Sequence, residues 1–142
     1  MTQEDKELLL KDLSARLTYG VKIKYATSPI NHCIFTLTEL NVKTSYNERL
    51  DLHYYPKLNG VYYYFDCQPY LRPMSSMTEE EVKEFNNLPS TKNYKIVDGD
   101  LPWDVANYKQ LDWLLKNHFD FRGLIPKGLA IEVTEENNPY KE

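Results

Sequence analysis

The chain has 142 residues, a formal net charge of −4 and a hydrophobic share of 42%. This length suits one domain that buries a core without disulfides or metals, and the absence of a dense basic patch disfavours nucleic acid as a partner. No run of about 18 apolar residues occurs, and the N-terminal stretch MTQEDKELLL is acidic where a signal peptide is basic, so the sequence predicts a cytoplasmic protein without a membrane span.

The first predicted element is a helix over residues 3–18. Thr2 with Asp5 in the following turn is typical of an N-cap with an acidic first turn. Leucines then recur at helical spacing, and Asp12 is predicted to lie among the polar residues on the solvent-facing side of the helix. Gly20 comes where a left-handed C-terminal cap is expected. The leucines of the apolar stripe are Leu9, Leu10, Leu13 and Leu17.

Between residues 20 and 71 the apolar period changes to alternation, which predicts strands. The alternating segments are VKIKYA, HCIFTLTEL, RLDLHY and, after an Asn-Gly turn signal, VYYYFDC. Short connections predict antiparallel neighbours. Pro69 and Pro73 cannot donate to a strand ladder, so we expect the last strand to end there or to run along an edge.

The segment PYLRPMSSMTEEEVKEF, residues 69–85, predicts a hinge into a second helix rather than a site. Thr78 with Glu81 three residues later forms a capping box. Met77 and Val82 supply the accompanying hydrophobic staple, and the three glutamates lie at the positive end of the helix dipole. Local structure therefore explains the acidic triplet without a ligand.

A short strand over 94–97, a longer helix after Pro102 and a closing strand over 129–133 complete the predicted elements. The fold class is α+β: an N-terminal helix, an antiparallel curved sheet or small barrel of about four to six strands, and two further helices packed on it. We expect a single domain over residues 1–134 and a flexible acidic tail over residues 135–142.

No motif for a metal, a cofactor or a phosphate is present. The three histidines share no ligand spacing, and the five glycines form no phosphate-binding loop. Cys–His pairs can be drawn, Cys67 with His53 or Cys33 with His118, but Cys67 shares a strand face with apolar residues. Both cysteines are expected to be reduced thiols. We therefore predict no catalytic, cofactor-binding or metal-ligating residue.

The candidate interaction surface consists of Tyr62 and Tyr64, with Lys22 and Lys24 nearby. Tyrosines on the outer face of a sheet can anchor a protein interface or stack on bases. The alternative is that a helix covers them, since a large exposed apolar patch is unusual on a monomer.

Two arginines in aromatic surroundings, Arg72 and Arg122, are interpreted as structural. Each is expected to bridge to a carboxylate, for which Asp120 and Glu132 are the candidates.

Two long blocks, LRPMSSMTEEE at residues 71–81 and WLLKNHFDFRGLIPKGLA at residues 113–130, together with the helix running into ARLTYGVK at residues 15–22, carry a resemblance. They resemble a family of small uncharacterised proteins of gut bacteria of the Bacteroides group, their prophages and phages. Residues 26–66 match no firm pattern. The resemblance implies no reaction, cofactor or catalytic residue; it implies a mobile-element origin and an accessory role.

The function predicted from the sequence is that of a non-catalytic accessory protein, phage or mobile-element derived, which acts by contact with a host or phage protein. One alternative is a small barrel that binds single-stranded nucleic acid through Tyr62 and Tyr64. The other alternative, which trails both, is a Cys–His enzyme.

Overall fold

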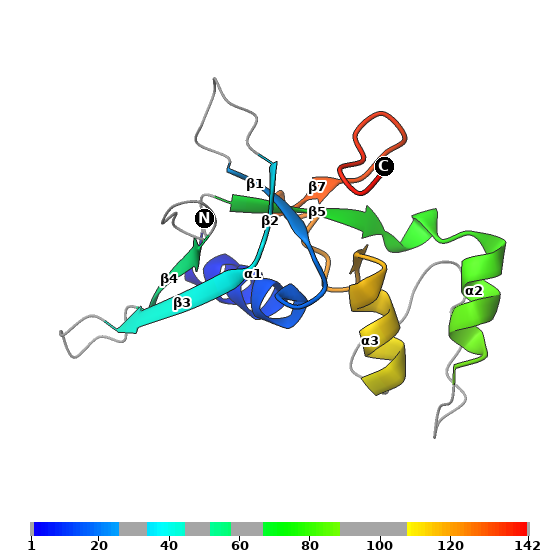
Figure 1. The fold of residues 1–142 in the computed structure, drawn as a ribbon, viewed down its shortest axis with the longest axis horizontal. Coiled ribbons are helices and arrows are strands. Elements are labelled where there is room, and N and C mark those ends of the chain that lie inside the picture. Colours follow the sequence, from blue (N-terminus) through cyan, green and yellow to red (C-terminus); the bar gives the residue numbers. More distant parts are fainter. Residues whose placement is uncertain (1, 26–33, 45–51, 58–66, 89–107, 142) are drawn as a thin grey trace.

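The computed structural model describes residues 2–25, 34–44, 52–57, 67–88 and 108–141, and every structural statement below concerns these residues. Within them the chain forms three α-helices, a five-stranded sheet and a separate two-stranded hairpin (Figure 1). The predicted α+β class is confirmed.

Helix α1 spans Gln3–Arg16 and confirms the predicted N-terminal helix. Thr2 Oγ1 accepts a hydrogen bond from the Asp5 amide at 3.1 Å, and the Asp5 carboxylate accepts one from the Thr2 amide at 3.2 Å. This reciprocal capping box satisfies backbone donors at the helix start. Beyond the helix, Gly20 takes the left-handed conformation expected of it, with φ of 71°.

The five-stranded sheet has the order β2-β1-β5-β6, and β7 also pairs with β5. Strand β1, Lys22–Tyr25, lies antiparallel to β2, Ile34–Thr36, and to β5, Cys67–Pro73. On its other side β5 pairs in parallel with β6, Phe119–Asp120, and with β7, Ile131–Glu132. Strand β5 therefore joins elements from both ends of the chain.

Two predictions about the sheet need correction. The sheet is mixed rather than antiparallel, because the chain passes through two helices after β5 before it returns, and a connection of that length permits parallel pairing. Strand β5 is also a central strand and not an edge strand, although it contains Pro69. Pro69 lies opposite Ile23 of β1, and pairing with β7 begins one residue later, at Tyr70, so the missing amide hydrogen interrupts no parallel ladder. The described strands do not close into a barrel.

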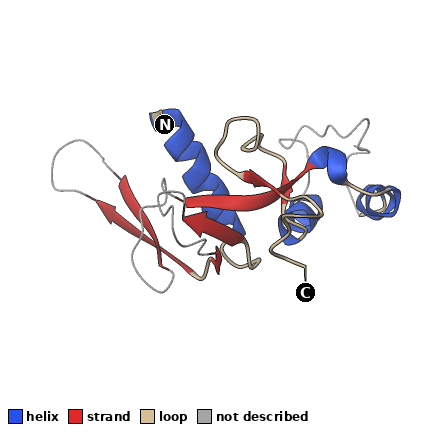
Figure 2. Ribbon diagram, turned by 90° about the horizontal axis from the view of Figure 1, so that it is seen from above, coloured by secondary structure: helices blue, strands red, loops and turns tan. Residues whose placement is uncertain are grey.

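Strands β3, Glu39–Thr44, and β4, Leu52–Lys57, form the separate antiparallel hairpin. It extends away from the five-stranded sheet at one end of the molecule (Figures 1 and 2). The predicted strand over HCIFTLTEL is thus divided between β2 and β3, and the strand predicted over RLDLHY corresponds to β4.

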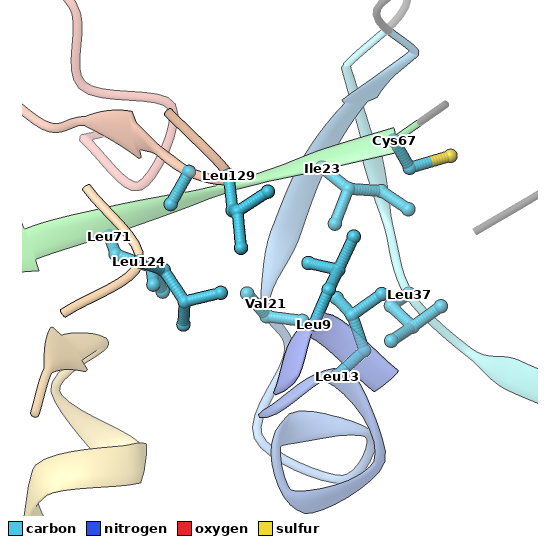
Figure 3. Close-up of a cluster of buried hydrophobic side chains, with 10 residues drawn as sticks. Leu9, Leu13, Val21, Ile23, Leu37, Cys67, Leu71, Leu124 and Leu129 are labelled. Carbon is cyan, nitrogen blue, oxygen red and sulfur yellow. The ribbon is translucent and has the colours of Figure 1, made fainter. Parts of the chain in front are cut away.

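The main hydrophobic core lies between α1 and the sheet (Figure 3). Leu9 and Leu13 of the helix are fully buried against residues of β1 and β5, as the helical spacing predicted. Ile34 of β2 is exposed, whereas Leu37, the residue after the strand, is buried. The buried members of this core are Leu9, Leu13, Val21, Ile23, Leu37, Cys67, Leu71, Leu124, Leu129 and Ala130.

A second core joins the two later helices. After the 3-10 turn η2, Met74–Ser76, helix α2 spans Glu79–Asn86, and helix α3 spans Tyr108–Lys116. Trp113 of α3 packs edge-on against Phe85 of α2, with ring centroids 5.5 Å apart. The buried members are Phe85, Trp113, Leu114, Leu115, Phe119 and Phe121.

Some of the predicted strands and helices fall wholly or partly outside the residues that the structure describes. The strand predicted over VYYYFDC, residues 61–67, lies outside the described residues except for Cys67, which begins β5. The strand predicted over residues 94–97 and the start of the helix expected after Pro102 also lie outside them. The closing strand is confirmed as β7. Strand β6 was not predicted from the sequence. The tail predicted to be flexible contains the half-buried Tyr140, whose hydroxyl is hydrogen-bonded to β1 and β5.

Candidate protein-binding cleft

The first sequence block is held by one bidentate ion pair. Arg72 at the end of β5 donates to both carboxylate oxygens of Glu81 in α2, at 2.8 and 2.6 Å. Glu81 also completes the capping box, since Thr78 Oγ1 accepts from the Glu81 amide and the Glu81 carboxylate accepts from the Thr78 amide, both at 3.1 Å. The hydrogen bonds from Arg72 hold the pKa of Glu81 below its ordinary value. The predicted cap is confirmed, and Glu81 is the carboxylate that Arg72 pairs with.

The second block packs against the first. The Arg72 guanidinium lies 4.2 Å from the centre of the Phe119 ring, and the Arg72 amide donates to the His118 carbonyl at 2.7 Å. Asp120 turns the chain after β6, because its carboxylate accepts from the amides of Leu124 and Ile125, both at 2.9 Å. The residues of both blocks therefore have architectural contacts that explain them.

A buried charge cluster joins α1 to the second block. Asp12 accepts from Arg16 Nε at 2.7 Å and from Arg122 Nη1 at 3.0 Å, and both Asp12 and Arg16 are fully buried. Arg16 Nη2 also donates to the Phe119 carbonyl at 2.6 Å. Arg122 was expected to pair with Asp120 or Glu132; its partner is Asp12, which the helical pattern placed on the wetter side. That placement of Asp12 is wrong, because two arginines from opposite ends of the domain draw its carboxylate into the interior.

This cluster is a structural element rather than a substrate site. Two guanidinium groups share one carboxylate, and within the described part of the chain Arg16 Nη1 and Arg122 Nε have no hydrogen-bond partner. Both cations lie over the Phe121 ring, at 5.3 and 4.7 Å from its centre. The ring contacts and Asp12 account for the position of both cations.

The described residues form a hollow along α3. Its volume is about 630 Å³, within the range of cavities that hold ligand groups. We call it the α3 cleft. Its apolar part contains Trp113 and Leu115, which are nearly buried, and three half-buried side chains contributed by α3 and its neighbours. The described residues that line it are Tyr19, Leu88, Lys109, Leu111, Asp112, Trp113, Leu115 and Lys116.

The cleft wall is held rigidly. The ring of Trp113 stacks on Phe119, with centroids 5.6 Å apart and planes at 14°, and meets Phe85 edge-on. Asn117 Nδ2 donates to the Trp113 carbonyl at 2.9 Å, and His118 ends the helix in a left-handed conformation, with φ of 62°. These contacts fix the position of Trp113 and of the C-terminal end of α3.

Charged groups border the apolar part. Lys109 and Lys116 are exposed and lie seven residues apart, two turns along the same face of α3. Neither ammonium group has an ion-pair partner among the residues that the structure describes. Asp112, between them, accepts a short hydrogen bond from the Tyr19 hydroxyl, and this bond raises the pKa of Tyr19. The border therefore has two cations without an ion-pair partner among the described residues, beside a carboxylate that is hydrogen-bonded to Tyr19.

The surface expected from the sequence is only partly described. Tyr62 and Tyr64 lie outside the described residues, so their exposure is not compared. Lys22 and Lys24 lie on β1 and are half-buried, and Lys22 Nζ donates to Thr36 Oγ1 at 2.5 Å. The α3 cleft was not predicted; the signal was the lysine pair at a spacing of seven on a helix whose apolar stripe is wider than one core requires.

No observation on the described residues supports either alternative function. Cys67 is a buried free thiol, whereas Cys33 and His53 lie outside the described residues. Within the described ranges, no three His, Cys, Asp or Glu side chains are grouped as a metal site would require. No helix in the same ranges combines the length and the apolar character needed to cross a bilayer.

Comparison with known proteins does not place the chain in a family. Comparisons of the chain with protein-family models, with curated proteins and with solved structures gave no match. The geometry of the α3 cleft is therefore the basis on which function is inferred.

Proposed function

We propose that the chain is a non-catalytic accessory protein that acts in the cytoplasm by protein–protein contact, and that the α3 cleft is its contact site. The observation that carries the proposal is a preformed apolar hollow bordered by two cations that have no partner in the described structure. An accessory role of phage or mobile-element origin rests on the resemblance of the two sequence blocks alone.

The chemistry of the cleft selects one kind of partner. Leu111, Leu115 and Trp113 provide a surface for one apolar side chain, which is how a central anchor residue binds in many interfaces. Lys109 and Lys116 lie roughly 10 Å apart along the helix axis, so they can meet carboxylates on either side of that anchor. The partner is therefore a protein segment with an apolar residue flanked by Asp or Glu.

The test is a selection from random 12-residue peptides displayed on phage. The affinity of each selected peptide is then measured by fluorescence anisotropy with a fluorescently labelled copy of it. The selected peptides should carry a Leu, Phe or Trp between acidic residues. The double substitution Lys109→Glu and Lys116→Glu should weaken binding by at least about tenfold, because both contacts become repulsive. The matched control Lys83→Glu, on the exposed side of α2, should leave affinity unchanged.

Two outcomes would overturn the proposal. One is the selection of peptides without acidic residues, or of none. The other concerns residues 98–104, DGDLPWD, which have the same mixture of apolar and acidic side chains. If peptides bind only after Leu101 and Trp103 are replaced by serine, the occupant is the chain itself and not a partner protein.

A further inference from the structure

The last residues of the chain return to the sheet, away from the α3 cleft. The segment Thr134 to Lys141, which we call the C-terminal strap, loops out beyond β7 and comes back beside β5 (Figure 1). Its anchor is Tyr140. The Tyr140 hydroxyl donates to the Tyr70 carbonyl of β5 at 2.7 Å and accepts from the Lys22 amide of β1 at 2.9 Å. One phenol group thus bridges the antiparallel strands β1 and β5.

The ring of Tyr140 has an aromatic partner, His118. The two rings lie nearly parallel, with centroids 3.8 Å apart and planes at 9°. The backbone of His118 is fixed on both sides, because its amide donates to the Leu115 carbonyl at 3.1 Å and its carbonyl accepts from the Arg72 amide. The imidazole therefore has little freedom to turn away while the strap is docked.

The position of His118 does not suit a charged imidazole. Its Nδ1 is buried and has no hydrogen-bond partner among the described residues, so a proton there would have no acceptor. Cations face the ring from three elements, and the carboxylates that pair with two of them are already engaged: Asp12 is bonded to Arg16 and Arg122, and Glu81 is bonded to Arg72. Burial, followed by these cations, lowers the pKa of His118 to about 4. The facing cations are Arg16 of α1, Lys22 of β1 and Arg72 of β5.

A charged imidazole stacked on a phenol ring gains some cation–π attraction, which acts in the opposite direction. That attraction is outweighed here, since three cations and an unsatisfied buried N–H oppose the same proton. When the strap leaves, the ring meets water and can take the proton at its ordinary pKa of about 6.5.

We propose that His118 and Tyr140 form a proton-sensitive latch, in which protonation of the imidazole releases the C-terminal strap from β1 and β5. The sign follows from linkage: the group binds a proton more weakly when docked, so docking is fully favoured above about pH 6.5 and is progressively lost as the pH falls toward 4. Neither His118 nor Tyr140 lines the α3 cleft.

The Lys22 amide is a direct probe, because its hydrogen-bond acceptor is the Tyr140 hydroxyl. Hydrogen exchange followed by NMR, corrected for the intrinsic exchange rate, should show its protection factor falling on the order of tenfold from pH 7 to pH 5. The Leu37 amide, which donates to the Val21 carbonyl at 2.9 Å, reports opening of the sheet itself and should keep its protection.

Two variants separate the latch from general loosening. His118→Asn keeps a residue that tolerates the left-handed backbone and cannot titrate, so the pH dependence at Lys22 should disappear. Tyr140→Phe keeps the stacked ring but loses both hydrogen bonds, so Lys22 should be poorly protected at every pH. Protection at Leu37 shows in each case that the variant is folded.

The proposal is wrong if Lys22 is equally protected at pH 5 and pH 7 in the unmodified protein, or if the loss persists in His118→Asn. A direct measurement covers the case in which that variant fails to fold. The ring resonances of His118 in the unmodified protein should titrate well below 6.5, and titration at the ordinary value with Lys22 still protected would overturn the latch.

Discussion

Two arginine–carboxylate contacts in this molecule have similar N···O distances and different surroundings. Arg72 and Glu81 form a bidentate pair at 2.6 and 2.8 Å whose side chains remain 25% and 19% exposed. Asp12 and Arg16 meet at 2.7 Å with both side chains fully buried. Water can replace a lost partner at the first contact but not at the second, so solvent access decides how much each contact contributes.

The largest effect is expected at the buried contact. Asp12→Ala leaves the guanidinium groups of Arg16 and Arg122 inside the protein without their carboxylate. Unfolding in urea should show a loss of about 3–5 kcal/mol in the free energy of unfolding. Glu7→Ala, an exposed carboxylate on the same helix, is the matched control and should change it by less than about 0.5 kcal/mol.

A triple replacement sharpens this test. Asp12→Leu with Arg16→Met and Arg122→Met removes the charges together with their desolvation, so it should regain a large part of the stability that Asp12→Ala loses. If the triple variant is less stable than Asp12→Ala, the stability lost in Asp12→Ala comes from the ion pairs themselves and not from leaving the two arginines buried without a carboxylate.

A smaller effect is expected where the capping box meets the exposed contact. Thr78→Ala removes the acceptor for the Glu81 amide, and the free energy of unfolding should fall by about 1 kcal/mol. Thr78→Ser retains the hydroxyl and should restore most of it. An unchanged urea midpoint in Thr78→Ala would mean that the cap does not contribute to stability.

The exposed contact itself should be weaker still. Arg72→Met removes both hydrogen bonds to Glu81 and the cation over Phe119, at an expected cost of about 0.5–1 kcal/mol. Because both Arg72 and Thr78 bind Glu81, the double variant should show non-additive losses in a double-mutant cycle. A cost near that of Asp12→Ala would remove the distinction between the two contacts.

The smallest effect is a dependence on pH. Arg72 lowers the pKa of Glu81 in the folded state, so the contact contributes fully above the ordinary value of 4.5, and the contribution is lost as the pH falls through the lowered folded value. The stability difference between the unmodified protein and Arg72→Met should therefore shrink below about pH 4.5. A difference that grows under acid conditions would contradict this sign.

Local signals in the sequence were sufficient for the elements they define. The N-cap at Thr2, the capping box at Thr78, the leucines of α1 and the alternation through β1 each depend on neighbours within a few residues, and each appears as expected. Such signals report local geometry, which the sequence contains explicitly.

Features that depend on distant contacts were missed. Asp12 looked exposed because its partner Arg122 comes from the other end of the domain. Pro69 suggested an edge because the parallel partners of β5 could not be identified from spacing. Tyr140 belongs to a polar segment, and its hydrogen bonds to β1 and β5 explain why it is half-buried. The α3 cleft likewise requires the relative placement of three segments.

The central position of β5 has a consequence for synthesis of the chain. Its antiparallel partner β1 is translated before it, whereas its parallel partners β6 and β7 are translated much later. Until those residues leave the ribosome, one side of β5 has no ladder partner, and Leu71 lacks Leu124 and Leu129 beside it. Nascent chains that stall before residue 119 thus present an open strand edge, the kind of surface that chaperones bind and that promotes aggregation.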